Sequence, residues 1–132
     1  MKREKWHKWK PLEGIPKTLC LEELKDNSEG LTISLRENIN SAILTVHFES
    51  YFSYRVTDEG DLLKTLHEME NQEILGKSSL FIVENSLYLQ WFYAQNYGMH
   101  ENTELTHYRI ATPDEVIDVL YLKEPNPTVM WS

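Results

Sequence analysis

Apolar and polar side chains alternate along the stretch from Ile43 to Val56. Successive side chains of a β-strand point to opposite faces, so this two-residue period predicts a strand with one buried face and one wet face. The Glu49-Ser50 pair interrupts the apolar face and indicates a bulge or a bend. The residues of the expected buried face all fall on even positions: Leu44, Val46, Phe48, Phe52, Tyr54 and Val56.

The period changes after the turn-forming segment Asp58-Glu59-Gly60-Asp61. Asp61 is suited to cap a following helix, and Gly76 is suited to end it. The apolar residues of this helix recur at helical spacing, at Leu62, Leu63, Leu66, Met69 and Ile74. We therefore expect an amphipathic helix that packs on the sheet.

Three further segments have strand patterns. The segment from Leu31 to Leu35 alternates, and a short Asn-rich loop separates it from the Ile43 strand, so the two should pair antiparallel. Leu19 and Leu21 indicate a short edge strand. The continuous apolar run from Leu80 to Val83 is typical of a central strand with both faces covered.

Two segments have patterns that fit either a helix or a strand. The stretch from Leu87 to Tyr97 is rich in aromatic residues with strand propensity, but Ser86 is a good helix cap and Gly98 a good terminator, so we favour a helix. Residues 107–122 contain a capping box at Thr112, which favours a helix. Their alternating and β-branched residues instead favour a hairpin in which 108–111 pairs with 116–122, and we expect the hairpin.

These elements predict an α+β fold: a mainly antiparallel sheet of five to six strands with two packed helices. At 132 residues the chain has the length of a single domain. We expect residues 1–12 to form a basic aromatic arm. Residues 124–132, which begin with Pro125 and Pro127, should form a C-terminal tail without regular structure.

Charge is unevenly distributed along the chain. Residues 1–10 carry five Lys or Arg and one Glu, whereas the other 122 residues carry eight basic and twenty acidic residues. So acidic a body repels phosphate backbones, which makes nucleic acid an improbable partner, and it attracts basic proteins. Solubility alone also explains such acidity, and it is the more common reason.

Trp6 and Trp9 lie among the basic residues of the arm. Such an arrangement binds single-stranded nucleic acid by stacking and charge, or an anionic lipid surface. We favour a simpler interpretation, in which both indoles cover an exposed part of the core.

The chain contains a single cysteine, Cys20, which lies in an apolar run. We expect a buried, reduced thiol in a cytoplasmic protein rather than a nucleophile. The basic start is not followed by an apolar segment, and no run approaches the roughly 18 residues of a membrane span, so we expect neither a signal peptide nor a membrane partner.

The sequence contains few signals of catalysis. The five histidines lack metal-ligand spacing, a single cysteine excludes a CxxC site, and no phosphate-cradling glycine loop is present, so we expect no metal or cofactor. An enzyme or ligand-binding domain would need a site assembled from scattered residues: His47, Glu84, His107 and Asp118. If their strands were neighbours, the two imidazoles and a carboxylate could converge; we favour surface histidines.

Two groups of residues are candidates for binding a protein partner. Asp58, Glu59 and Asp61 form an acidic knuckle that could meet a partner's Lys or Arg, although acids at a helix N-terminus also stabilise the helix. Trp91 and Tyr93 belong to an aromatic set that is more often core than interface, but would mark an interface if exposed.

The order of these motifs resembles a known group of proteins. The motifs are Tyr54-Arg55 before Asp58-Glu59-Gly60-Asp61, the run 80–86 before Trp91-Phe92, and His107-Tyr108 before Ile117-Asp118-Val119. They resemble small uncharacterised Firmicute proteins, some of which look like immunity proteins of polymorphic toxin systems. The resemblance implies a cytoplasmic, non-enzymatic protein that occludes a toxin domain, here a basic one. The alternatives are the small enzyme above and a self-associating structural protein whose aromatic patch forms a homodimer.

Overall fold

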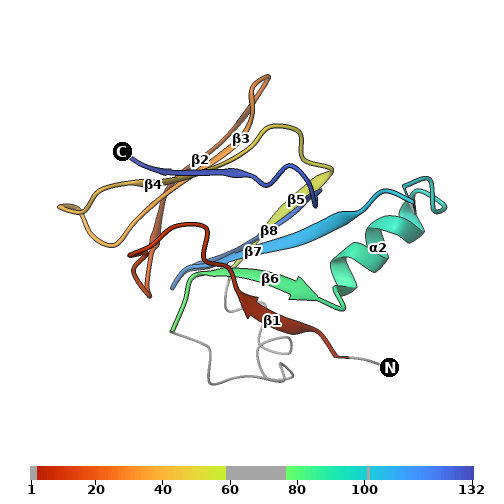
Figure 1. Ribbon diagram of the computed structural model, residues 1–132, viewed down its shortest axis with the longest axis horizontal. Coiled ribbons are helices and arrows are strands. Elements are labelled where there is room, and N and C mark those ends of the chain that lie inside the picture. Colours follow the sequence, from red (N-terminus) through yellow and green to blue (C-terminus); the bar gives the residue numbers. More distant parts are fainter. Residues whose placement is uncertain (1–2, 59–76, 101) are drawn as a thin grey trace.

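The computed structural model describes residues 3–58, 77–100 and 102–132, which form two antiparallel sheets and one helix (Figure 1). The five-stranded sheet has the order β1-β6-β7-β8-β5, and the four-stranded sheet has the order β2-β3-β4-β9. The elements of the first sheet are β1 (Lys5–Lys8), β5 (Ser53–Asp58), β6 (Leu80–Glu84), β7 (Leu105–Ala111) and β8 (Glu115–Leu122). Those of the second are β2 (Cys20–Asn27), β3 (Gly30–Arg36), β4 (Leu44–Phe48) and β9 (Thr128–Trp131), and the helix is α2 (Leu87–Gln95).

The predicted single sheet with two packed helices is wrong. The described residues form two sheets with nine strands in all, and they contain one short helix. The error arose because the alternating run from Ile43 is two strands, which are separated at Glu49-Ser50. The first, β4, lies in the four-stranded sheet, and the second, β5, pairs with β8 in the five-stranded sheet. Val56, expected to be buried, is half exposed. The helix predicted after Asp61 lies outside the described residues.

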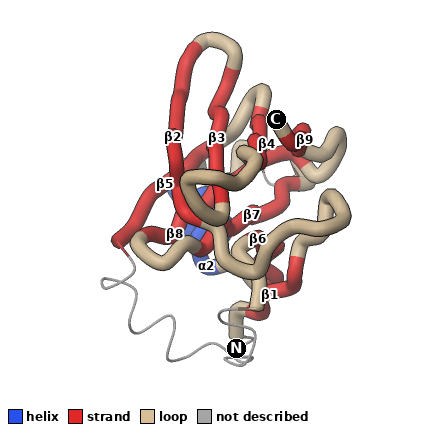
Figure 2. The backbone as a smooth tube through the Cα atoms, turned by 90° about the vertical axis from the view of Figure 1, so that its left-hand side faces the viewer, coloured by secondary structure: helices blue, strands red, loops and turns tan. Residues whose placement is uncertain are grey.

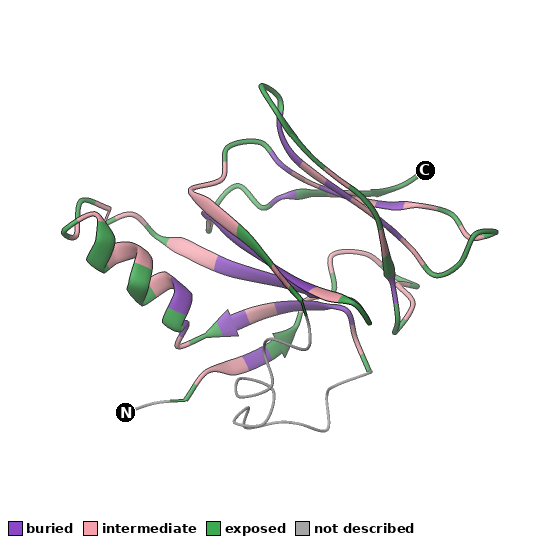
Figure 3. Cartoon of the chain, turned by 180° about the vertical axis from the view of Figure 1, so that it is seen from behind, coloured by how far each residue is buried: buried purple, intermediate pink, exposed green. Residues whose placement is uncertain are grey.

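The two sheets pack on each other and enclose the main core (Figure 3). The four-stranded sheet contributes the alternating residues of β3 and β4, which are fully buried as predicted. Phe48 is fully buried and meets Tyr108 and Tyr121 edge-on, with ring centroids 5.6 and 5.3 Å apart. The buried core residues are Leu19, Leu31, Ile33, Leu35, Leu44, Val46, Phe48, Leu80, Tyr108, Ile110, Ile117, Val119 and Tyr121.

Several local predictions are confirmed. The strands β3 and β4 pair antiparallel, β6 is internal, and β7 and β8 form the expected hairpin. The strand β2 lies at a sheet edge as expected, but it is eight residues long rather than short. The helix α2 begins after Ser86, whose side chain accepts a hydrogen bond from the Leu89 N–H, and Gly98 follows it with a positive φ of 75°. This helix is not long and apolar enough to cross a membrane.

The chain ends differ from the prediction in part. The arm lays its indoles over the core as expected: Trp6 is buried, and Trp9 lies 4.8 Å from the ring of Tyr108. The arm also contains β1, which pairs with β6. Residues 124–132 are not an irregular tail, because the chain resumes a strand after Pro127, and β9 pairs with β4 (Figure 2).

The prediction of a buried Cys20 is wrong, because its thiol is exposed. Leu19 is fully buried beside it. Neighbouring side chains at a strand point to opposite sides, so burial of Leu19 turns Cys20 outward.

Gly30 is required where β3 begins. Its φ is +114°, and a Cβ there would lie 2.4 Å from the backbone oxygen of Phe48. Gly14 also has a positive φ, +73°, but a Cβ there would meet nothing within 4 Å. The two glycines therefore separate the cost of backbone strain from the cost of a clash.

We expect Gly30→Ala to lower the free energy of unfolding by about 2–5 kcal/mol, since strain and overpacking add. The matched variant Gly14→Ala should cost only about 1–2 kcal/mol, because it meets strain alone. Urea unfolding monitored by tryptophan fluorescence measures both. Equal losses in the two variants would contradict the close approach of β3 to Phe48.

Candidate functional site on the outer face of the five-stranded sheet

A row of polar side chains crosses the five-stranded sheet on the face opposite the main core. Tyr108 and Ile110 of β7 point into the core, so His107 and Arg109 point outward. The register places Arg109 directly opposite Asp118 of β8, and Asp118 directly opposite Arg55 of β5. Directly opposed side chains are neighbours, so this register puts one carboxylate between two guanidinium groups.

Asp118 is the centre of this row and is completely buried. Its Oδ1 accepts hydrogen bonds from His107 Nε2 at 2.6 Å and Arg109 Nε at 2.5 Å, and its Oδ2 accepts one from Arg55 Nε at 3.0 Å. Burial alone raises the pKa of Asp118, but the hydrogen bond from His107 and the charge of Arg109 outweigh it. The pKa therefore lies well below its usual range, and the carboxylate stays ionised.

His107 connects Asp118 to the start of α2. Its Nδ1 lies 2.6 Å from the hydroxyl oxygen of Ser86. Burial lowers the pKa of His107, and the hydrogen bond to Asp118 only partly opposes this effect. A neutral ring that donates from Nε2 to Asp118 and accepts at Nδ1 from Ser86 satisfies every group. Ser86 still accepts the Leu89 N–H at 2.9 Å, so the same hydroxyl holds the ring and caps the helix.

The two arginines differ in exposure. The Arg109 side chain is 1% exposed, and its guanidinium lies 4.6 Å from the ring of Trp6. Its Nη1 is buried, makes no hydrogen bond to the described residues, and is 3.8 Å from Glu4 Oε1. Arg55 is 43% exposed and lies over the ring of Tyr88, 4.1 Å from its centroid.

An open cleft of about 490 Å³ lies between this row and α2. Tyr88 anchors the helix beside it through a hydrogen bond to the Ser53 hydroxyl. Trp91 stacks on Tyr88, with ring centroids 5.8 Å apart. Figure 3 shows that full burial in α2 is confined to its beginning, whereas the later turns alternate between intermediate and exposed residues. The cleft is lined by Glu4, Arg55, Thr57, Leu87, Tyr88, Trp91 and Arg109.

The four residues of the expected scattered site are only partly brought together. His107 and Asp118 are hydrogen-bonded partners. His47 lies in the other sheet and pairs with the Thr32 hydroxyl at 2.9 Å. Glu84 lies at the end of β6, where its carboxylate meets His7 at 2.9 Å. Two of the four thus belong to the polar row, and the other two do not.

The expected partner-binding residues are also divided. Asp58 ends β5 and is exposed, whereas Glu59 and Asp61 lie outside the described residues. Trp91 is 52% exposed and lines the cleft. Tyr93 is partly buried, and its hydroxyl donates to the Thr103 carbonyl at 3.1 Å.

Sequence reasoning missed Arg109 and the role of Arg55 at the cleft. A signal was present: Asp118 is a charged residue inside the apolar strand Val116–Leu122, and such a residue needs a buried partner. Arg109, two residues after His107, shares the outward face of its strand and was the natural candidate.

The described residues contain no group of three or more His, Cys, Asp or Glu side chains that could hold a metal ion. Compared with protein-family models, curated proteins and solved structures, the chain matches none of them.

The lowered pKa of His107 makes stability depend on pH. The unfolded ring takes up a proton below its ordinary pKa of about 6.5, whereas the folded ring resists it, so the free energy of unfolding falls as the pH drops below that value. The expected slope is at most about 1.4 kcal/mol per pH unit.

Denaturant unfolding at a series of pH values between about 7.5 and 5 measures this dependence. His107→Gln should remove this part of the slope. The control variant His47→Gln, in the other sheet, keeps His107 and should keep it. An unchanged slope in His107→Gln would show that the ring is not held neutral.

Proposed function

We propose that this chain is a non-enzymatic protein-binding module whose partner docks on the exposed side of α2 and the adjoining cleft. The observation that carries the proposal is the pair Leu87 and Trp91, one helical turn apart, which are 59% and 52% exposed and line the cleft. Exposed Trp and Arg side chains beside a pocket are the residue types that dominate binding energy at interfaces. Arg55 is the exposed arginine beside this cleft.

An acyl-transfer enzyme is the competing interpretation, because Ser86, His107 and Asp118 form a continuous hydrogen-bonded chain. Binding is favoured over catalysis by the burial of all three residues. The Ser86 oxygen already accepts the helix N–H of Leu89, and a nucleophile must instead approach a substrate carbonyl. In our proposal the hydrogen bonds that link Ser86, His107 and Asp118 are structural, and they orient α2.

The partner we propose is a basic toxin domain in the cytoplasm, neutralised by occlusion. The acidity of the chain, a formal net charge of −8, supports this choice because opposite charge speeds encounter and discriminates among partners. The likeness to toxin-immunity proteins, carried by the motifs from Tyr54 to Asp118, supports the same choice. The acidic residue Asp58 would lie at the border of the docking face.

We expect co-expression with the toxin domain encoded by the neighbouring gene to give a stable complex that weakens at high salt. Trp91→Ala should weaken it about 30-fold or more, as expected for a central interface residue. The matched control is Trp131→Ala, which removes a partly exposed Trp from β9 in the other sheet and should leave the affinity unchanged.

Calorimetric titration of the purified components measures both variants. Failure to form a complex, or equal effects of the two substitutions, would contradict the docking face. Light scattering at several concentrations tests self-association, and a dimer that Trp91→Ala abolishes would assign the same face to a second copy of the chain.

A further inference from the structure

Arg55 presents unused hydrogen-bond donors at the cleft. Its Nε is bound to Asp118, but its two Nη groups make no hydrogen bond to the described residues. The side chain is held in one orientation by Asp118 on one side and the Tyr88 ring on the other. A guanidinium fixed in this way offers two parallel N–H groups, the geometry that pairs with a carboxylate.

The formal charges around Arg55 balance, because Arg55 and Arg109 face the carboxylates of Asp118 and Glu4, but the hydrogen-bond donors of Arg55 are not all used. Asp118 is shared between Arg55 and Arg109, so one carboxylate serves two guanidinium groups. Glu4, the other acid in the cleft, accepts the Leu87 N–H at 2.8 Å and lies on the side of Arg109, whose Nη1 it does not reach within hydrogen-bonding distance. The exposed donors of Arg55 therefore have no acceptor in the described residues.

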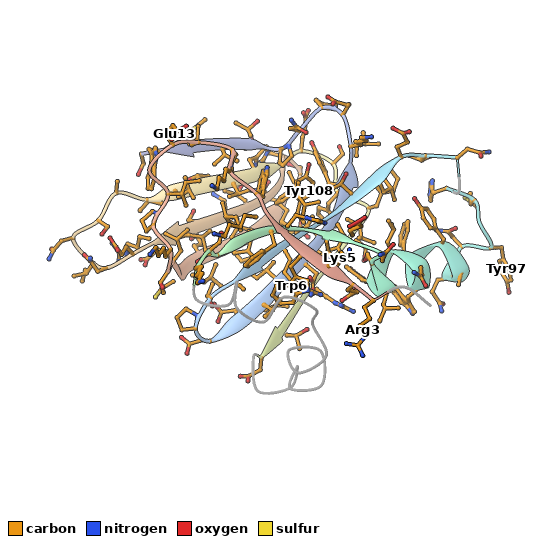
Figure 4. The ribbon with its side chains drawn as sticks, turned by 60° about the horizontal axis from the view of Figure 1, so that its bottom comes forward. Arg3, Lys5, Trp6, Glu13, Tyr97 and Tyr108 are labelled. Atoms are coloured by element: carbon orange, nitrogen blue, oxygen red, sulfur yellow. The ribbon has the colours of Figure 1, made fainter. Side chains whose placement is uncertain are left out.

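The walls of the cleft fit the rest of an acidic side chain. Trp91 and Leu87 provide apolar surface beside the guanidinium, on which the methylene groups of a Glu or Asp would rest. Figure 4 shows Tyr97 at the far end of α2, pointing away from the body, so it takes no part in this cleft.

We propose that the cleft binds an acidic side chain, Glu or Asp, of the protein partner. This inference rests on the proposed function and specifies its chemistry. The carboxylate pairs with the Nη groups of Arg55, and the stem contacts Trp91. In a chain with a net charge of −8 a carboxylate is repelled over most of the surface, so the fixed donors of Arg55 at this cleft set the register of an otherwise basic partner.

The test uses the full chain and two short peptides, acetyl-Gly-Glu-Gly-amide and acetyl-Gly-Gln-Gly-amide. Nitrogen-15 NMR follows the Arg55 Nε–H and the Trp91 indole N–H during titration. The Glu peptide should shift both signals, with an affinity at least about tenfold above that of the Gln peptide, as expected for a charge-assisted hydrogen bond.

Arg55→Gln should weaken binding of the Glu peptide at least about tenfold, and Arg55→Lys should recover part of it, since a point charge replaces the planar fork. The matched control is Arg36→Gln, which removes a surface arginine paired with Glu22 in the other sheet and should change nothing. Backbone NMR spectra and unfolding curves confirm that each variant is folded.

Four outcomes overturn the inference: no shift up to about 10 mM Glu peptide, where even a weak site would fill, equal binding of the Gln peptide, equal loss in Arg36→Gln, or tighter binding of inorganic phosphate than of the Glu peptide. The last result would assign the cleft to a phosphate group. If the partner complex depends on Trp91 while the Glu peptide fails, the inference fails and the proposed function stands.

Discussion

One buried carboxylate holds the outer face of the five-stranded sheet together. Asp118 accepts hydrogen bonds from Arg55, Arg109 and His107, and so joins β5, β7 and β8. Removing a charge from water costs several kcal/mol, and a buried ion is tolerated only with good partners. Through His107 the same network reaches Ser86, which caps α2. The position of the helix thus depends on a charge in the sheet.

Successive side chains of β7 and β8 point to opposite faces, so the two faces of the five-stranded sheet have separate roles. Its inner face carries Tyr108 and Ile110 into the core shared with the four-stranded sheet. Its outer face carries the polar row that orients Arg55 and the start of α2. Side chains locked by packing and hydrogen bonds lose little entropy on binding, so an interface built on them gains affinity through preorganisation. We infer that the buried network serves the exposed cleft in this way.

Local patterns in the sequence predicted local structure well. The paired strands β3 and β4, the β7–β8 hairpin, and α2 with Ser86 at its start follow from alternation and capping, which act over a few residues. The pattern could not show that the chain changes sheet after Phe48, because apolar residues resume on even positions after the interruption at Glu49-Ser50. Nor could it place Arg55 beside Asp118, 63 positions away, since the pairing of β5 with β8 depends on the whole topology. The charge of Asp118 within an apolar strand was the clue that a buried partner existed.

The most direct test of this account is the stability of Asp118→Asn, measured by denaturant unfolding at neutral pH. The substitution keeps the shape of the side chain but leaves the buried Arg109 with only the more distant carboxylate of Glu4, 3.8 Å away. We predict a loss of about 3–5 kcal/mol in the free energy of unfolding, the range for breaking one half of a buried ion pair. A loss below about 1 kcal/mol, as for an exposed pair, would contradict the central role of this carboxylate.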